Sequence, residues 1–256
     1  MSEKWPDLPI VASVDLPPLA GGQDEILWPC LLDLSEHLAQ PHAVIGGVMV
    51  FLHGAAAGRQ PARVTKDVDV LFDVGIVPTS LRDAVAVLAG LDYRVDPASP
   101  DDSTHRYLGP NGEVVDILAP AGLRPPPDLT TTPPGRTVAV YGGLSALQNR
   151  VVISASYRGR TQEVVVPDLP RAITIKCAAH RVQARDRPAE AYRSRHLVDI
   201  AFLLSLVTDI DETIDSLVHE SFADITALDD RNHPAWASAD PQREDARLVW
   251  SELRKQ

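Results

Sequence analysis

The stretch from His42 to Asp73 places the strongest constraint on how this chain folds. It consists of a short apolar run, the pair Gly46-Gly47, an apolar segment of helical length, a loop, and the run Asp67-Val-Asp69-Val-Leu-Phe-Asp73. This order predicts a strand, a glycine turn, a buried helix and a second strand. Side chains alternate along a strand, so Asp67 and Asp69 are expected on one face, about 6–7 Å apart.

Carboxylates and a glycine turn at this spacing point to the binding of a cation and an anion side by side. Two carboxylates on one strand face suit hard divalent cations, which favour oxygen ligands. The turn at Gly46 and Gly47 offers backbone amides and a helix N-terminus to an anionic group. A third carboxylate, Asp116, interrupts the apolar run 114–118 and needs a hydrogen bond, a cation or a functional role if it is buried. The combination suggests phosphoryl or nucleotidyl transfer from a metal–nucleotide complex.

The rest of the chain predicts an α+β protein with a mixed sheet domain followed by a helical C-terminal domain. Residues 1–22 are rich in proline and predict an arm, ordered only if it docks. Apolar residues at helical spacing predict a helix over 24–40, interrupted near Pro29. Further helices are expected over 78–90, 170–185, 190–208, 211–221 and 241–254, and further strands over 93–96, 105–108, 113–119, 138–141, 151–155 and 163–166. The sequence Gly109-Pro-Asn-Gly112 predicts a hairpin turn before the strand at 113–119. The pattern changes near Asp168, which predicts domains over 23–168 and 169–256.

Bulk composition narrows the class of protein. The 256 residues are 45% hydrophobic and 23% charged, as in ordinary globular proteins. Cys30 and Cys177 lie far apart and predict reduced, buried thiols rather than a disulfide framework. The first residues lack the apolar core of a signal peptide, and the longest apolar run, 199–207, is too short to span a membrane. We therefore expect a cytoplasmic protein without a membrane partner.

Charge is distributed unevenly along the chain. The net charge of −11 argues against general nucleic-acid binding. Residues 148–197 nevertheless carry ten basic and four acidic side chains, a balance of +6, so the remainder carries −17. Two interpretations remain open for this segment: a basic surface for a phosphate-bearing ligand or nucleic acid, or ordinary solvated helix faces.

Two motifs carry a family resemblance. The pattern Gly46-Gly47…His53-Gly54…Arg63-x-Thr65-x-Asp67-x-Asp69, with Asp116 on a later strand, resembles the DNA polymerase β-like nucleotidyltransferase superfamily. The later segment Lys176-x-x-Ala-His180-Arg181…Arg195-His-Leu-Val-Asp199 is similar to the AbiEii/AbiGii-type toxin branch, whose members belong to toxin–antitoxin and phage-defence systems. The resemblance covers roughly residues 25–208. Many superfamily members have Gly-Ser in place of Gly46-Gly47, and the branch often has an acidic residue at the position of His196.

The resemblance implies a role for each matching residue. Asp67, Asp69 and Asp116 would be catalytic residues that hold Mg²⁺ or Mn²⁺, and Asp116 would also help to deprotonate the attacking hydroxyl. The nucleotide triphosphate would be bound by Gly46, Gly47, Thr65, Lys176, Arg63 and His180. The implied partners are an NTP, a tRNA or other RNA acceptor, and a cognate antitoxin.

Helix geometry refines the expectations for the second motif. At 100° per residue, His180 lies in the same stripe as Lys176, which predicts that the two face the nucleotide together. Arg195 and Asp199 are four residues apart and fit either a site role or a helix-surface ion pair of small energetic value.

Two other functions fit the same residues. The transferred nucleotide could go to a protein hydroxyl or a small molecule instead of RNA, with the chemistry unchanged. Alternatively, the chain could be a non-catalytic nucleotide- or partner-binding protein on a decayed transferase scaffold.

Overall fold

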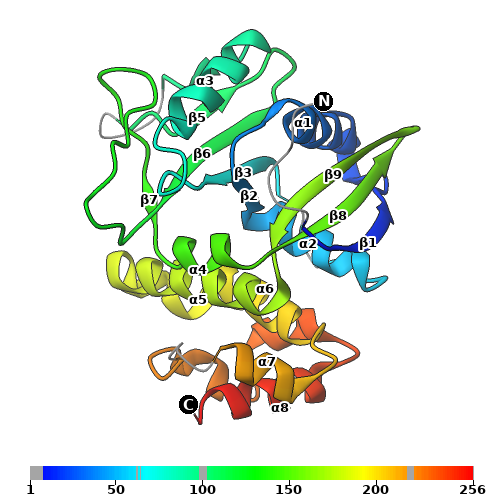
Figure 1. Ribbon diagram of the computed structural model, residues 1–256. Helices are drawn as coiled ribbons and strands as arrows, with labels where there is room; N and C mark the ends of the chain where they lie inside the picture. The colour runs from blue at the N-terminus through cyan, green and yellow to red at the C-terminus, as the bar shows by residue number, and fades with distance from the viewer. Residues whose placement is uncertain (1–7, 62, 64, 98–102, 218–221, 256) are drawn as a thin grey trace.

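A mixed six-stranded sheet, a smaller three-stranded sheet and a helical C-terminal part make up the protein (Figure 1). The computed structural model describes residues 8–61, 63, 65–97, 103–217 and 222–255. Its strands are β1 (Ile10–Asp15), β2 (His42–Ile45), β3 (Asp67–Phe72), β4 (Arg94–Val95), β5 (Arg106–Leu108), β6 (Val114–Pro120), β7 (Ala139–Val140), β8 (Arg150–Tyr157) and β9 (Arg160–Pro167). Its α-helices are α1 (Asp24–His37), α2 (Gly46–Ala56), α3 (Ser80–Gly90), α4 (Gly143–Gln148), α5 (Leu169–Asp186), α6 (Arg195–Leu204), α7 (Ile210–Ser216) and α8 (Arg243–Leu253). Short 3₁₀ turns cover Ala20–Gly22, Pro188–Arg193, Thr226–Asp229 and Pro234–Ala239.

The larger sheet has the strand order β2-β3-β6-β5-β4, with β7 paired to β6. Strands β3 and β6 are parallel, whereas β2 pairs with β3, and β5 with β6, in antiparallel fashion. The hairpin predicted at Gly109–Gly112 is confirmed, since it joins β5 to β6. The predicted strand–helix–strand unit forms as β2, α2 and β3. Helix α2 returns the chain so that β3 runs antiparallel to β2. The sheet therefore brings β3 and β6, the two strands with carboxylates, into direct contact.

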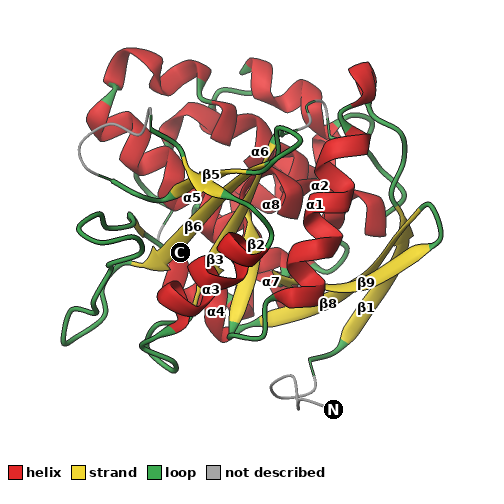
Figure 2. Cartoon of the chain, turned by 90° about the horizontal axis from the view of Figure 1, so that it is seen from above, coloured by secondary structure: helices red, strands yellow, loops and turns green. Residues whose placement is uncertain are grey.

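Helix α2 is buried around its circumference because almost all of its side chains are apolar. It contacts β3 on one side and α6 on the other. Figure 2 shows α1 and α2 beside the three-stranded sheet of β1, β8 and β9. Buried α2 thus connects the glycine turn rigidly to both the sheet and the later helices.

Two predictions about the N-terminal region need correction. Helix α1 runs without a break through Pro29, because Trp28, Leu31 and Leu32 on either side are fully buried and their burial outweighs the lost hydrogen bond. The arm predicted over residues 1–22 contains strand β1, which pairs in parallel with β8. Residues 1–7 of that arm lie outside the described residues.

The described part of the chain after Pro167 is helical. Helix α5 begins where the sequence pattern changes, with the Asp168 side chain accepting a hydrogen bond from the Arg171 amide at 3.0 Å. Residues 218–221 of the helix predicted over 211–221 lie outside the described residues, and α7 ends before them at Ser216. In the part of the chain that the structure describes, every helix is too short or too polar for a transmembrane span.

Candidate functional site

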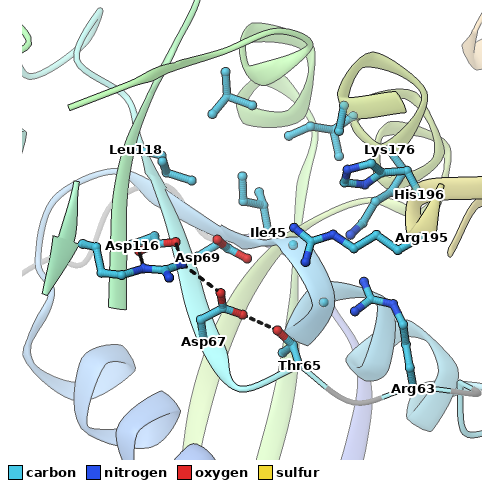
Figure 3. A pocket seen from close by; sticks show the side chains of 16 residues that line it. Ile45, Arg63, Thr65, Asp67, Asp69, Asp116, Leu118, Lys176, Arg195 and His196 are labelled. Atoms are coloured by element: carbon cyan, nitrogen blue, oxygen red, sulfur yellow. Dashed lines mark hydrogen bonds and ion pairs between the residues drawn. The ribbon is translucent and has the colours of Figure 1, made fainter. Parts of the chain in front are cut away.

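The three predicted carboxylates converge because sheet register places them in neighbouring positions. Asp69 on β3 is paired with Asp116 on β6, and Asp67 lies two residues earlier on the same face of β3. One carboxylate oxygen from each of the three residues lies within 4.8 Å of the others. Figure 3 shows the three side chains along one wall of a pocket, facing Lys176, Arg195 and His196 on the helices opposite. The sequence predicted the members of this cluster, and the pairing of β3 with β6 brings them together.

The glycine turn lies directly against the acidic cluster. Gly46 has a φ of +69°, and a Cβ built on it would overlap Oδ2 of Asp69. A Cβ on Gly47 would lie 2.5 Å from Cβ of Thr65. Thr65 in turn donates a hydrogen bond from its hydroxyl to Asp67. Gly46 is therefore required by the close approach of Asp69, and Gly47 by the close approach of Thr65. A serine at position 47 would displace Thr65.

Arg106 is a site residue that the sequence analysis missed. It lies on β5 opposite Asp116, and its Nε and Nη2 donate hydrogen bonds to the two oxygens of Asp116 at 2.8 and 2.7 Å. Its Nη2 also reaches Oδ2 of Asp67 at 3.2 Å. These hydrogen bonds raise the pKa of Arg106 above its ordinary value. The signal was present in the sequence, because the turn at Gly109–Gly112 fixes the register that pairs Arg106 with Asp116.

The contact with Arg106 fixes the orientation of Asp116. Both carboxylate oxygens of Asp116 accept hydrogen bonds from one guanidinium, which makes the pair planar and bidentate. The expected help of Asp116 in deprotonating a hydroxyl stays a prediction. Asp116 is well placed to define the shape and charge of the acidic wall.

Asp69 differs from the other two carboxylates of the cluster in having no hydrogen-bond donor within the part of the chain that the structure describes. None of the described residues donates a hydrogen bond to it, and burial together with repulsion from Asp67 and Asp116 raises its pKa to about 7. Lys176 and Arg195 oppose this rise from across the pocket. A set of oxygen donors with unbalanced negative charge fits a divalent cation such as Mg²⁺ or Mn²⁺. Asp67 and Asp69 would hold such an ion, with Asp116 beside them.

Lys176 lines the same pocket, as predicted, but its ammonium group is tied to a partner. Its Nζ donates to Oδ2 of Asp199 on α6 at 2.8 Å, and the two side chains are only 5% and 3% exposed. Arg63 donates to the same carboxylate from Nε at 3.2 Å and from Nη2 at 3.0 Å. Although burial on its own raises the pKa of Asp199, Lys176 and Arg63 together hold it below its ordinary value.

This network corrects the interpretation of Asp199 as half of a helix-surface pair with Arg195. Asp199 points inward and joins α6 to α5 and to the loop before β3. Arg195 stands at the first position of α6 and makes no hydrogen bond or ion pair with any described residue. It lines the pocket as an exposed cation that is free to meet an anionic ligand.

His196 and His180 occupy different environments. His196 lines the pocket, and burial together with the cations Lys176 and Arg195 lowers its pKa to about 3, so its ring is neutral at physiological pH. His180 does not line the pocket, so the structure does not bring it together with the other predicted nucleotide-binding residues. Ala179 takes that place, because α5 turns His180 toward Asp224 and His233 in the helical C-terminal part. A helical wheel assigns residues only to a broad face of the helix, so it could not distinguish His180 from Ala179 as the residue that faces the pocket.

The motif residue His53 also lies outside the pocket. Its Nε2 donates a hydrogen bond to the carbonyl oxygen of Pro167 at 2.9 Å, which ties the end of α2 to the end of β9. Burial lowers its pKa to about 4, so the ring is neutral. His53 holds the scaffold of the site together without facing it.

The basic character of residues 148–197 is largely compensated in the folded protein. Seven of the ten basic side chains form ion pairs with described carboxylates: Arg158, Arg160, Arg171, Lys176, Arg181, Arg185 and Arg187. Their acidic partners come partly from outside the segment, for example Glu25 and Asp33 on α1. Most of the positive charge of this segment is therefore balanced by neighbouring carboxylates, on the β8–β9 hairpin as well as on the helices.

A larger cavity adjoins the acidic pocket. The pocket itself has a volume of about 190 Å³, and its neighbour has about 760 Å³. The two share the lining residues Val140, Ala179, Arg195 and His196, so Arg195 stands at their junction. The larger cavity also carries Tyr141, Arg185 and Arg187. A larger open space therefore lies directly beside the acidic cluster.

Comparison with known proteins adds no relative: no family model, curated protein or solved structure matches this chain.

Proposed function

We propose that this protein is a metal-dependent nucleotidyltransferase, which moves an NMP unit from an NTP to an acceptor hydroxyl and releases pyrophosphate. The observation that carries the proposal is the convergence of Asp67, Asp69 and Asp116 in one pocket with two cations opposite, Lys176 and Arg195. A triphosphate between these walls would have metal-binding carboxylates on one side and positive charge on the other. The resemblance of the same residues to the DNA polymerase β-like superfamily supports the same chemistry.

The residues of the site would have separate roles. Asp67 and Asp69 would bind Mg²⁺ or Mn²⁺, which when present neutralises charge on the triphosphate and on the leaving pyrophosphate. Gly46 and Gly47 allow the backbone to approach the phosphates at the start of α2. Lys176, fixed by Asp199, supplies a buried positive charge at a defined point, and exposed Arg195 adjusts to the ligand.

The structure constrains the identity of the acceptor less than it constrains the binding of the NTP. The cavity beside the pocket has room for it, and exposed Tyr141 with Arg185 and Arg187 suits a nucleotide end. Arg185 and Arg187 are paired with Asp186 and Glu190, so the positive charge available there is small. A tRNA or other RNA acceptor, the role of a toxin and a cognate antitoxin rest on the family resemblance.

The test is transfer of label. The protein is incubated with Mg²⁺, each NTP labelled at the α-phosphate, and total bacterial RNA, beside an Asp67→Ala/Asp69→Ala variant. Label in RNA with the wild type alone supports transfer to RNA and identifies the nucleotide. Label in a protein band or a small molecule keeps the chemistry and changes the acceptor. Bound nucleotide with no label in any product would instead favour the non-catalytic interpretation.

A further inference from the structure

The acidic wall already contains a cation that belongs to the protein. The guanidinium of Arg106 binds both oxygens of Asp116, at 2.8 and 2.7 Å, and one oxygen of Asp67, at 3.2 Å. It thus bridges two of the three carboxylates that form the candidate metal site. Nη2 of Arg106 lies between one oxygen of Asp67 and one oxygen of Asp116 and donates a hydrogen bond to each.

The fold fixes Arg106 in this position. Directly paired residues across the sheet are Ile45 with Asp69, Asp69 with Asp116, and Asp116 with Arg106. Arg106 therefore lies in the same cross-strand row as Asp69 and Asp116, and the tight turn after β5 sets its register with Asp116. The planar, bidentate pairing with Asp116 adds directional hydrogen bonds to the attraction of opposite charges.

Charge decides how many cations the cluster still requires. Within the cluster itself, apart from Lys176 and Arg195 across the pocket, the three ionised carboxylates bring −3 and Arg106 brings +1, which leaves −2. A single divalent ion balances this remainder. The three Arg106 contacts leave Asp69 as the carboxylate with no hydrogen-bond donor among the described residues, and one oxygen of Asp67 faces Thr65 instead of Arg106.

We propose that Arg106 is a built-in cation that replaces one of two divalent ions, so that the protein takes a single ion, on Asp67 and Asp69. Arg106 is a positioning residue in this arrangement: it acts through Asp116 and Asp67 and holds their carboxylates at a fixed separation. The inference rests on the proposed function, because it assumes that the acidic cluster binds a divalent cation. It departs from the site that the resemblance implies, in which all three aspartates hold metal.

The inference is tested by counting bound metal. The full-length protein is titrated with Mn²⁺ in the absence of nucleotide, and free Mn²⁺ is followed by electron paramagnetic resonance. The variants are Arg106→Met, which keeps the length of the side chain without its charge, and Arg106→Lys, which keeps the charge. Arg160→Met is the matched control, since Arg160 also bridges two carboxylates, Asp33 and Glu36, away from the pocket. Circular dichroism of each variant checks the fold.

The expected result is one Mn²⁺ per chain in the wild type, in Arg106→Lys and in Arg160→Met, and two in Arg106→Met. Two ions in the wild type, or an unchanged count of one in Arg106→Met, would overturn the inference and leave the proposed function standing. An absence of Mn²⁺ binding by both the wild type and Arg106→Met would contradict the proposed metal site itself. If Arg106→Met fails to fold, Arg106→Gln is titrated in its place, with the same expectation of two ions.

Discussion

Replacing Asp199 with Asn tests the buried ion network that positions Lys176. The ammonium group of Lys176 and the carboxylate of Asp199 lie 2.8 Å apart and are 5% and 3% exposed, so water cannot compensate for the loss of either charge. Removing one partner of such a pair typically costs about 3–5 kcal/mol, because the other charge is left buried. Arg63 is less affected, since a third of its side chain remains exposed.

A loss of this size is a large share of the total stability of about 5–15 kcal/mol that is typical of folded proteins. We expect Asp199→Asn to lower the free energy of unfolding by about 3–5 kcal/mol in urea titrations followed by tryptophan fluorescence. Trp28, Trp236 and Trp250 are buried and should report the transition. The matched control is Asp33→Asn, which removes a carboxylate from an exposed pair with Arg160 and should change stability by about 1 kcal/mol or less.

A double variant separates the lost charge from a general loss of packing. Lys176→Met/Asp199→Leu replaces the buried pair by apolar side chains and should recover most of the stability that Asp199→Asn loses. If the free energy of unfolding of Asp199→Asn stays within about 1 kcal/mol of that of the wild type, water reaches Lys176 despite its low exposure, and the reasoning fails. If the double variant is less stable than Asp199→Asn, packing rather than charge dominates at this position.

Four further outcomes follow from the geometry of the acidic cluster and the glycine turn. Asp69 has a pKa raised from 3.8 to about 7, so the metal-free folded protein binds an extra proton between these values. Its stability should therefore fall as pH rises from about 4 to 7, by at most about 1.4 kcal/mol per pH unit, and then level off; Asp69→Asn should remove this slope. Mn²⁺ affinity should rise with pH over the same range, because the ion requires the charged carboxylate, and calorimetric titrations at several pH values would measure it. Gly46→Ala should abolish Mn²⁺ binding, since the added Cβ overlaps Asp69 and the positive φ costs a further 1–2 kcal/mol or so. Gly47→Ser should lower label transfer by displacing Thr65, and higher transfer in this variant would contradict the packing described here.

Local sequence patterns predicted much of the sheet and the helices. Alternation of apolar and acidic residues located β3, and the Gly109–Gly112 turn located the β5–β6 hairpin. The prediction failed at Pro29, where burial of the neighbouring side chains keeps α1 continuous. It also gave no strand in the N-terminal arm, because β1 depends on pairing with β8, more than a hundred residues away. Pairing between distant strands leaves little trace in local periodicity.

The residues of the candidate site could likewise be predicted only in part from the sequence. Asp67, Asp69 and Asp116 could be selected from the sequence, because a carboxylate in an apolar strand requires an explanation wherever it occurs. The partners of these groups could not be selected. Arg106 is one of many arginines until sheet register sets it against Asp116, and Asp199 resembles a surface residue until α6 packs on α5.

The sequence by itself determined which residues can carry charge into the interior and on which face of β3 they stand. The pairing of β2 with β3, by contrast, is what places Gly46 and Gly47 next to that strand, since the glycines and Asp69 are far apart along the chain. Only the tertiary structure decided how these charges are balanced: Arg106 on Asp116 and Asp67, Lys176 and Arg63 on Asp199, and Arg195 without a carboxylate partner among the described residues. The reason is physical. A buried charge is stabilised by whichever opposite charge the packed chain brings within a few ångströms, and that distance depends on the whole fold.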